Sequence, residues 1–527
     1  MKITSTRILL TGSVLATSSF AAENQVAAAT AACRPNVLFI LTDDMQFDAI
    51  HALGNDQIHT PQLDRLVREG VSFSRAYIMG GNNPAVCCPS RGMIHTGRSL
   101  YRIEFSPGGA ITNGGKTMAE RQGQTPLPAR TPWGHITNGV ETMAETFRKA
   151  GYRTFATGKQ HNGPQIVASG FTDAGNLLFA GGGQHMRLKV HDFDPSGRYA
   201  PEDGKVVPQY SSEIFTGAAL DFLDRDRAGD PFFMYLAYTV PHDPIMAPPK
   251  FMSLYPPDKI RLHPTFQPAH PFDVSRIGDR VRPMQSCDEC EADAVIKFHE
   301  WPIEESDMQS LVAGYYAMLT HLDDQIGRIR ARLEELGEWQ NTIIVFASDN
   351  GIAMGRHGCY HKQTSYDHDA HVPLILCGPG LAKGESRNAM VYLYDLYPTL
   401  CDLAGIPVPD SVEGKSFVPV LRGDESAGRD VLYHAYVNDW RAVYDGRYRL
   451  LLYAGYDEAN DVIVRRRMLF DVQADPMETR DLAGDPAHAT EVARLESLLI
   501  ELRDQYADPM VPDGFWERYT GNPPDGE

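Results

Sequence analysis

The sequence has few cysteines for its length, with eight in 527 residues. So small a number excludes a scaffold held together mainly by disulfides. A chain of this length can bury a large core, and its hydrophobic content of 43% is ordinary for a globular protein. The C-x-x-C pair at 287–290 has no second such pair with which to form a zinc site, so we expect a local disulfide there.

Positive charge is also scarce, because 49 lysines and arginines stand against 68 acidic residues and the net charge is −19. This balance argues against a nucleic-acid-binding protein and against binding to an anionic membrane, since both need a basic surface. An anionic substrate would require local positive charge at its binding site. The expected partners therefore include neither nucleic acid nor a membrane.

Long apolar runs are missing, so we expect no membrane-spanning helix. Residues 1–22 contain Lys2, Arg7, a short apolar stretch diluted by polar residues, and then small residues, which is the form of a secretory signal peptide. Cys33 lies too far beyond that stretch for a lipid-modified cysteine. We therefore expect an exported protein, either periplasmic or secreted.

Short apolar runs alternate with helical patterns, which predicts an α/β fold with a large mixed, mostly parallel sheet sandwiched by helices. The expected buried strands are 36–41, 153–157, 231–240 and 342–348. From about residue 430, alternating segments followed by a helical pattern predict an antiparallel sheet plus helix. We expect a main domain over 34–428, which carries any active site, and a smaller C-terminal α+β domain over 429–527.

Polar side chains follow each of these expected strands. They are Asp43 and Asp44, Lys159 and His161, His242, and Asp349 and Asn350. Ligands bind beyond the carboxyl ends of the strands in open α/β sheets, so these side chains are candidates for one site. Each acidic pair alone is also common in turns and helix caps. Their joint occurrence beside lysine and histidine favours a functional site.

The oxygen-bearing members of this set predict a site for a hard cation. Asp43, Asp44, Asp349 and Asn350 offer no nitrogen or sulfur ligand, which suits Ca²⁺ or Mg²⁺ and not zinc. Three clustered carboxylates would repel one another unless a cation or protonation relieved them. The local positive charge for an anionic substrate would come from Arg91, Lys159, Lys362, His161 and His242.

Two adjacent cysteines, Cys87 and Cys88, stand in front of a proline, a serine and an arginine. Such a pair can be buried filler, a vicinal disulfide, a metal ligand or a nucleophile. We expect a helix here, capped by Cys88 or Ser90 with Pro89 in its first turn, which places Cys87 at the positive end of the helix dipole beside Arg91. The residues alone thus favour a hydrolase-like site with a nucleophile at 87 or 88, and a reactive thiol remains an alternative.

The segment CCPSRGMIHTGR at 87–98 is similar to the type I sulfatase signature C-x-P-S-R-x-x-x-x-T-G-R at every fixed position. Similar blocks follow in the family's order along nearly the whole chain, among them NVLFILTDD at 36–44, TIIVFASDNG at 342–351 and HKQTSYDHDAHVPLIL at 361–376. The resemblance implies the alkaline-phosphatase-like superfamily and a sulfuric ester hydrolase.

The resemblance also implies a modified residue and a metal. Cys87 would be oxidised to formylglycine (3-oxoalanine) by a maturation enzyme that reads the proline, the arginine and the later Thr-Gly-Arg. One Ca²⁺ would be held by residue 87 together with Asp43, Asp44, Asp349 and Asn350, with Mg²⁺ the poorer fit.

Further roles come from the same resemblance. Arg91 would orient the formylglycine hydrate. Lys159 and Lys362 would contact sulfate. His161 would take a proton from the hydrate, and His242 would contact sulfate and assist the leaving oxygen. One hydrate hydroxyl would attack sulfur, and loss of a proton from the other would then expel sulfate.

The sequence departs from the family at Gln160, where tryptophan is usual, and at Asp367 and His371, where glutamate and arginine are common. These changes leave the pocket residues unassigned, and we expect 101–135 and 251–305 to line the pocket. The predicted substrate is a sulfated carbohydrate or a sulfated small molecule. The alternatives are a phosphonate or phosphate monoester hydrolase with the same nucleophile, a non-catalytic glycan-binding protein and, weakest, a thiol-redox protein.

Overall fold

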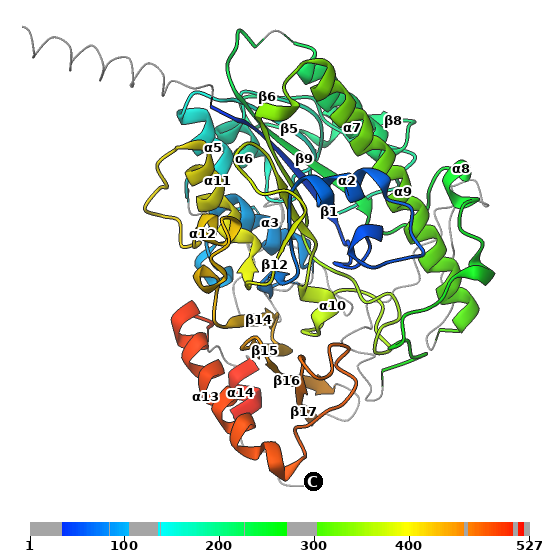
Figure 1. Ribbon diagram of the computed structural model, residues 1–527, viewed down its shortest axis with the longest axis vertical. Helices are drawn as coiled ribbons and strands as arrows, with labels where there is room; N and C mark the ends of the chain where they lie inside the picture. The colour runs from blue at the N-terminus through cyan, green and yellow to red at the C-terminus, as the bar shows by residue number, and fades with distance from the viewer. Residues whose placement is uncertain are drawn as a thin grey trace, which may run out of the picture.

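The computed structural model describes eight stretches of the chain (Figure 1). They are 34–83, 85–104, 135–136, 139–225, 227–270, 303–457, 462–509 and 515–520. The predicted signal peptide at 1–22, Cys33 and the C-x-x-C pair at 287–290 lie outside these residues, as does most of the two segments expected to line the pocket. Within the described part, no helix combines the length and the apolar character needed to cross a bilayer.

The main sheet has eight strands in the order β12-β2-β11-β10-β1-β9-β5-β6. Only β11 runs antiparallel to its neighbours, so the sheet is mixed and mostly parallel, as the sequence predicts. In this order the strands are Glu385–Arg387, Val71–Phe73, Leu374–Cys377, Thr342–Ser348, Asn36–Asp43, Phe232–Pro241, Arg153–Lys159 and Asp173–Leu178.

Helices cover both faces of this sheet, which is why its central strands are continuous apolar runs. Leu38 and Ile40 of β1 pack against one set of helices, and Val37 and Phe39 pack against the other. The first set is α2 (Pro61–Glu69), α7 (Ser211–Leu223) and α9 (Glu305–Glu335). The second is α3 (Cys87–Thr96), α5 (Met143–Lys149), α6 (Pro164–Gly170) and α11 (Leu396–Ala404).

Several short elements complete the main part. The helices are α8 (Pro249–Met252), α10 (Asp367–Ala370) and α12 (Val418–Leu421). Two small strand pairs are β3 (Ala76–Tyr77) with β13 (Val391–Tyr392), and β7 (Leu188–Val190) with β8 (Lys205–Val207).

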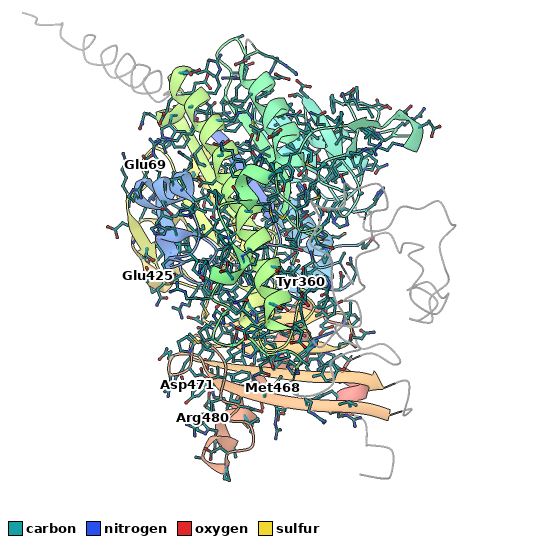
Figure 2. The ribbon with its side chains drawn as sticks, turned by 90° about the vertical axis from the view of Figure 1, so that its right-hand side faces the viewer. Glu69, Tyr360, Glu425, Met468, Asp471 and Arg480 are labelled. Atoms are coloured by element: carbon teal, nitrogen blue, oxygen red, sulfur yellow. The ribbon has the colours of Figure 1, made fainter. Side chains whose placement is uncertain are left out.

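The C-terminal part is an antiparallel sheet with helices, as the sequence predicts, and it lies at one end of the molecule (Figures 1 and 2). Its strands are β14 (Leu432–Tyr436), β15 (Trp440–Tyr444), β16 (Tyr448–Asp457) and β17 (Val462–Asp471). The helices beside it are α13 (Ala489–Tyr506) and α14 (Phe515–Thr520). The domain boundary at 428/429 stays a prediction.

A fifth strand of this sheet comes from early in the chain. β4 (Gly80–Gly81) pairs in parallel with β14, six residues before Cys87. Gly80 has φ of +99°, and a Cβ there would lie 2.0 Å from the carbonyl oxygen of Ala435, so the pairing requires glycine. The approach to Cys87 is therefore fastened to the C-terminal sheet.

A buried ion pair joins strand β15 of this sheet to the segment that follows α13. Arg441 of β15 contacts Asp508 through two nitrogens, at 2.5 and 2.9 Å, and Trp516 donates to the same carboxylate at 3.1 Å. Because both charges are excluded from water, removal of one leaves the other buried without compensation.

Asp508→Ala is expected to lower the free energy of unfolding by about 3–5 kcal/mol, measured by urea denaturation. Asp504→Ala serves as the control because its carboxylate pairs with Arg503 in solvent, and we expect no measurable change from it. Equal losses from the two variants would contradict the importance of the buried pair.

Candidate active site

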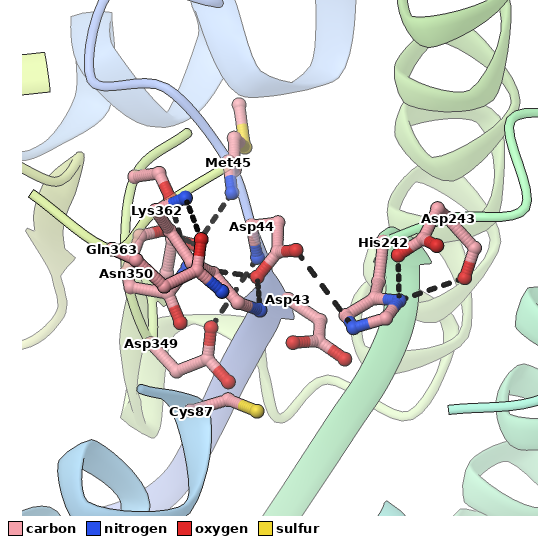
Figure 3. A network of polar contacts seen from close by, with 12 residues as sticks. Asp43, Asp44, Met45, Cys87, His242, Asp243, Asp349, Asn350, Lys362 and Gln363 are labelled. Atoms are coloured by element: carbon pink, nitrogen blue, oxygen red, sulfur yellow. Dashed lines mark hydrogen bonds and ion pairs between the residues drawn. The ribbon is translucent and has the colours of Figure 1, made fainter. Parts of the chain in front are cut away.

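Three carboxylates and one amide meet where β1 and β10 end side by side (Figure 3). Thr42 is in register with Ser348, so the residues that follow them lie level. The backbone N–H of Asp44 donates to Asp349 Oδ1 at 3.3 Å, and Asn350 Nδ2 donates to Asp44 Oδ1 at 2.7 Å. The structure thus brings together Asp43, Asp44, Asp349 and Asn350, all of them buried.

Each carboxylate has its own basic partner from a different element. The pairs are Lys159 Nζ with Asp43 Oδ2 at 2.5 Å, Arg91 Nε with Asp349 Oδ2 at 2.7 Å, and Lys362 Nζ with Asp44 Oδ1. The expected repulsion among the carboxylates is therefore relieved by side chains of the chain itself.

The carboxylates differ in how their environments act on them. Burial raises the pKa of Asp43, but Lys159 and His242 outweigh it and the pKa lies below its ordinary value. Burial and the charge of Asp43 raise the pKa of Asp349 above its ordinary value, with Arg91 opposing. Of these two carboxylates, Asp43 is thus the one that its surroundings hold in the ionised form.

The donor atoms of this cluster fit a hard cation. Asp43 Oδ1 and Asn350 Oδ1 are buried and find no hydrogen-bond partner among the described residues. Ligand atoms of Asp43, Cys87 and Asp349 all lie within 4.8 Å of one another. Buried oxygen atoms left unpaired are costly unless a ligand satisfies them, and an all-oxygen set suits Ca²⁺. The four residues could therefore hold calcium.

Helix α3 places Cys87 at its first position, facing the carboxylates (Figure 3). The predicted cap at Cys88 or Ser90 is wrong, because the cap is Val86, and the N–H of Ser90 already bonds to the carbonyl of Val86. Pro89 lies in the first turn as expected. The positive end of the helix dipole thus faces residue 87.

The two cysteines have different environments. Both are thiols and not disulfide partners. Burial and the neighbouring Cys87 raise the pKa of Cys88 to about 12, so its thiol stays protonated and unreactive. Asn162 donates to the Cys88 carbonyl at 2.9 Å. Cys88 is therefore a buried packing residue, and Cys87 alone faces the charged groups.

Lys159 and His161, at the end of β5, both contact Cys87. Lys159 Nζ and His161 Nδ1 each lie 3.4 Å from its Sγ, which stands where a formylglycine oxygen would be. Arg91 also donates to the carbonyl of Lys159 at 2.8 Å. Burial, Lys159 and Arg91 lower the pKa of His161 well below its ordinary value, so the imidazole is neutral.

His242 follows β9 and has the opposite character. Its Nδ1 lies 2.8 Å from Asp243 Oδ1, and its Nε2 lies 3.9 Å from Asp44 Oδ2 (Figure 3). Burial opposes protonation, but Asp243 and Asp44 raise the pKa of His242 to about 10. One histidine of the site is thus held neutral and the other protonated, which is the arrangement that acid–base catalysis requires.

The sequence-based site omits two residues that the structure places in it. Asp243, which directly follows His242, was not assigned to the site, although its Pro-His-Asp-Pro setting was a usable signal. Tyr315 of α9 donates to the carbonyl of Asp44 at 2.9 Å and accepts from the N–H of Gln46 at 2.9 Å. Its helical spacing marks it only as part of an apolar face, so the sequence carries no signal for this contact.

The structure also shows the surroundings of the three residues that depart from the family pattern. Gln160 is fully buried, and its Nε2 donates to the carbonyl of Gly158 at 3.2 Å. Asp367 and His371 contact each other, with Nδ1 of the imidazole 2.9 Å from the carboxylate. A carboxylate–imidazole pair thus stands where the family commonly has glutamate and arginine.

Comparisons with known proteins place the chain among sulfatases. The profile of the sulfatase family matches residues 35–406, and that of the N-sulphoglucosamine sulphohydrolase C-terminal region matches 355–505. An N-acetylglucosamine-6-O-sulfatase of Bacteroides thetaiotaomicron is 25% identical over 90% of this chain and 87% of its own.

Solved structures are similar over nearly their whole length. One, in complex with its substrate D-glucosamine-2-N,6-O-disulfate, has a TM-score of 0.69 at 24% identity, covering 91% of this chain and 99% of that one. A phosphonate monoester hydrolase of Silicibacter pomeroyi has a TM-score of 0.64 at 25% identity, covering 90% and 96%. The family match spans most of the chain, so the protein belongs to the sulfatase family, the type I sulfatases of the alkaline-phosphatase-like superfamily, and is a sulfuric ester hydrolase.

Proposed function

We propose that this sulfatase uses Ca²⁺ and formylglycine at residue 87 to release sulfate from a sulfated carbohydrate. The observation that carries the proposal is the position of Cys87 Sγ. It lies within reach of the oxygen-rich cluster on one side and of Lys159 and His161 on the other. An oxygen nucleophile at this position would be both a metal ligand and a proton donor to a neutral imidazole.

The charge of the site supports an anionic substrate. Three basic side chains balance three carboxylates, so a bound divalent cation leaves the site with net positive charge. This local charge is what an acidic protein with a net charge of −19 needs to bind a sulfate ester. The charged groups are buried, which strengthens their action on charge that develops on the sulfuryl oxygens.

The side chains divide the chemistry among them. Calcium and hydrated formylglycine would supply a polarised hydroxyl nucleophile at residue 87. His161 Nδ1, neutral and facing residue 87, accepts a proton there. His242 Nε2 holds a proton for the leaving oxygen while Asp243 fixes its Nδ1. Lys159 and Lys362 stabilise negative charge on the sulfuryl group.

The comparisons support a sulfated carbohydrate as the substrate class. One similar protein is an N-acetylglucosamine-6-O-sulfatase, and one similar structure is a complex with a disulfated glucosamine. We further propose that the leader at 1–22 directs export, and that a formylglycine-generating enzyme acts on Cys87. The likeness to a phosphonate monoester hydrolase keeps phosphonate and phosphate esters as a second candidate.

Cys87→Ala is expected to lower kcat/KM by at least about a thousandfold, because the nucleophile and one metal ligand are both lost. Cys88→Ala removes only a buried sulfur and retains turnover, with a loss of stability of about 1 kcal/mol. Mass spectrometry of the wild-type peptide spanning residue 87, from cells with a maturation enzyme, should show formylglycine. An unmodified thiol alone, or equal loss of activity from both variants, would refute the proposed nucleophile.

Rates on matched aryl esters separate the two candidate substrate classes. With one leaving group, we expect the sulfate ester to react faster than either alternative. The phosphate monoester carries a second negative charge, and the phosphonate monoester, with the same single charge as the sulfate ester, has one fewer terminal oxygen for Lys159 and Lys362 to contact. A faster phosphonate or phosphate reaction would reverse the assignment. No turnover by protein with residue 87 fully converted would support a non-catalytic glycan-binding protein.

Calcium removal should destabilise the protein, because ligand binding stabilises the folded state by mass action, by about 2.7 kcal/mol at a concentration one hundred times Kd. After chelation, added Ca²⁺ should raise the unfolding temperature of the wild type and have less effect on Asp349→Asn. Asp504→Asn, on the surface of α13, should respond as the wild type does. A preference for Mg²⁺ over Ca²⁺ would correct the proposed metal.

A further inference from the structure

Helix α10 packs directly against the turn that carries the cation-site residues. The N–H of Gly351, which follows Asn350, donates to the carbonyl of Asp369 at 3.0 Å. A Cβ on Gly351 would lie 2.1 Å from the carbonyl oxygen of His368, so the two backbones touch. A displacement of α10 must therefore move the turn that holds Asn350.

The same helix anchors the segment that carries Lys362. Asp369 Oδ2 accepts a hydrogen bond from the N–H of Thr364 at 2.9 Å and another from its hydroxyl. Thr364 is two residues beyond Lys362, whose ammonium group contacts Asp44. One short helix thus supports both the cation-site turn and a lysine that faces it.

On its other side, α10 is held by the C-terminal sheet. Arg449 of β16 contacts Asp367 Oδ1 through Nη2, and its Nε lies 2.9 Å from Glu478 Oε1. Glu478 Oε2 accepts from the N–H of Asp367 at 3.0 Å. Tyr77 also donates to Asp367 Oδ1, at 2.9 Å. Arg449 therefore binds the side chain of Asp367, the first residue of α10, and Glu478 binds its backbone N–H.

Burial makes this contact rigid. The Arg449 side chain is 0% exposed and that of Glu478 is 2% exposed, so displacement of either would leave the buried Arg449 charge without one of its partners. His371 stands where the family block commonly has arginine, and Arg449, whose guanidinium is always charged, contacts the same Asp367 carboxylate. The permanent positive charge beside Asp367 therefore comes from the C-terminal sheet.

We propose that Arg449 and Glu478 are positioning residues of the active site, which hold Asn350 and Lys362 in place through α10. The C-terminal sheet then contributes to calcium affinity and to substrate binding without touching either ligand. This inference rests on the proposed function of the site.

The chain provides a matched control in the Arg441–Asp508 pair. Arg441 is 2% exposed and lies on β15 of the same sheet. It is three residues from Tyr444, the cross-strand partner of Arg449, so it points to the opposite face. Its ion pair is with Asp508, and its other contacts in the described part of the chain are with backbone carbonyls of Val437 and Trp440 and with two aromatic rings, not with α10. Arg441→Lys therefore weakens a comparable buried pair that does not contact α10.

The test compares Arg449→Lys, Glu478→Gln and Arg441→Lys in the full-length, matured protein. Lysine keeps the charge but cannot contact both acidic residues as arginine does. The measurements are the Ca²⁺ dissociation constant by calorimetry, the unfolding temperature, and kcat and KM for a sulfate ester. We expect Arg449→Lys and Glu478→Gln to weaken Ca²⁺ binding about 10–100-fold and to raise KM, whereas Arg441→Lys lowers only the unfolding temperature.

Equal Ca²⁺ affinity and KM in the Arg449→Lys and Arg441→Lys proteins would overturn the inference, as would loss of stability alone. If Arg449→Lys does not fold, Glu478→Gln decides, because glutamine can still accept the N–H of Asp367 but no longer pairs with arginine as an ion. A wild type that neither binds Ca²⁺ nor hydrolyses the ester would reject the proposed function itself. A competent wild type with unaffected variants would reject only the positioning role.

Discussion

The site depends on the burial of equal numbers of positive and negative charges at one edge of a sheet. Asp43, Asp44 and Asp349 could not share this space without Lys159, Lys362 and Arg91, and none of the six is exposed to water that could screen them. Each charge therefore fixes its neighbour. The strands that carry the carboxylates and the helix that carries Cys87 are aligned by the same set of ion pairs.

The two histidines beside these charges differ in protonation because their neighbours differ in charge. His161 lies beside Lys159 and Arg91 and is kept neutral, while His242 lies beside Asp243 and Asp44 and is kept charged. The two imidazoles thus begin the reaction in the states that their proposed roles require. The C-terminal sheet contacts this site indirectly: it packs on one side of α10, and the cation-site turn packs on the other.

Much of this could be predicted from sequence because the signals are local. β1 and β10 are uninterrupted apolar runs, and the residues that bear oxygen follow them directly. The pairing of Arg449 with Asp367 could not be predicted, because 82 residues separate them and an alternating strand pattern does not tell which distant residue a side chain contacts. The cap of α3 was misplaced because Val86, a poor capping residue, takes the position through backbone geometry alone.

The pairing of β4 with β14 bears on when the proposed modification of residue 87 could take place. All ten residues of α3 are buried, so an enzyme that recognises the signature around Cys87 cannot reach it in the finished fold. The partner strand of Gly80 and Gly81 is made some 350 residues later. Until the ribosome has produced that strand, β4, which leads into α3, has no partner in the C-terminal sheet. The proposed modification of residue 87 would therefore have to precede completion of this part of the fold.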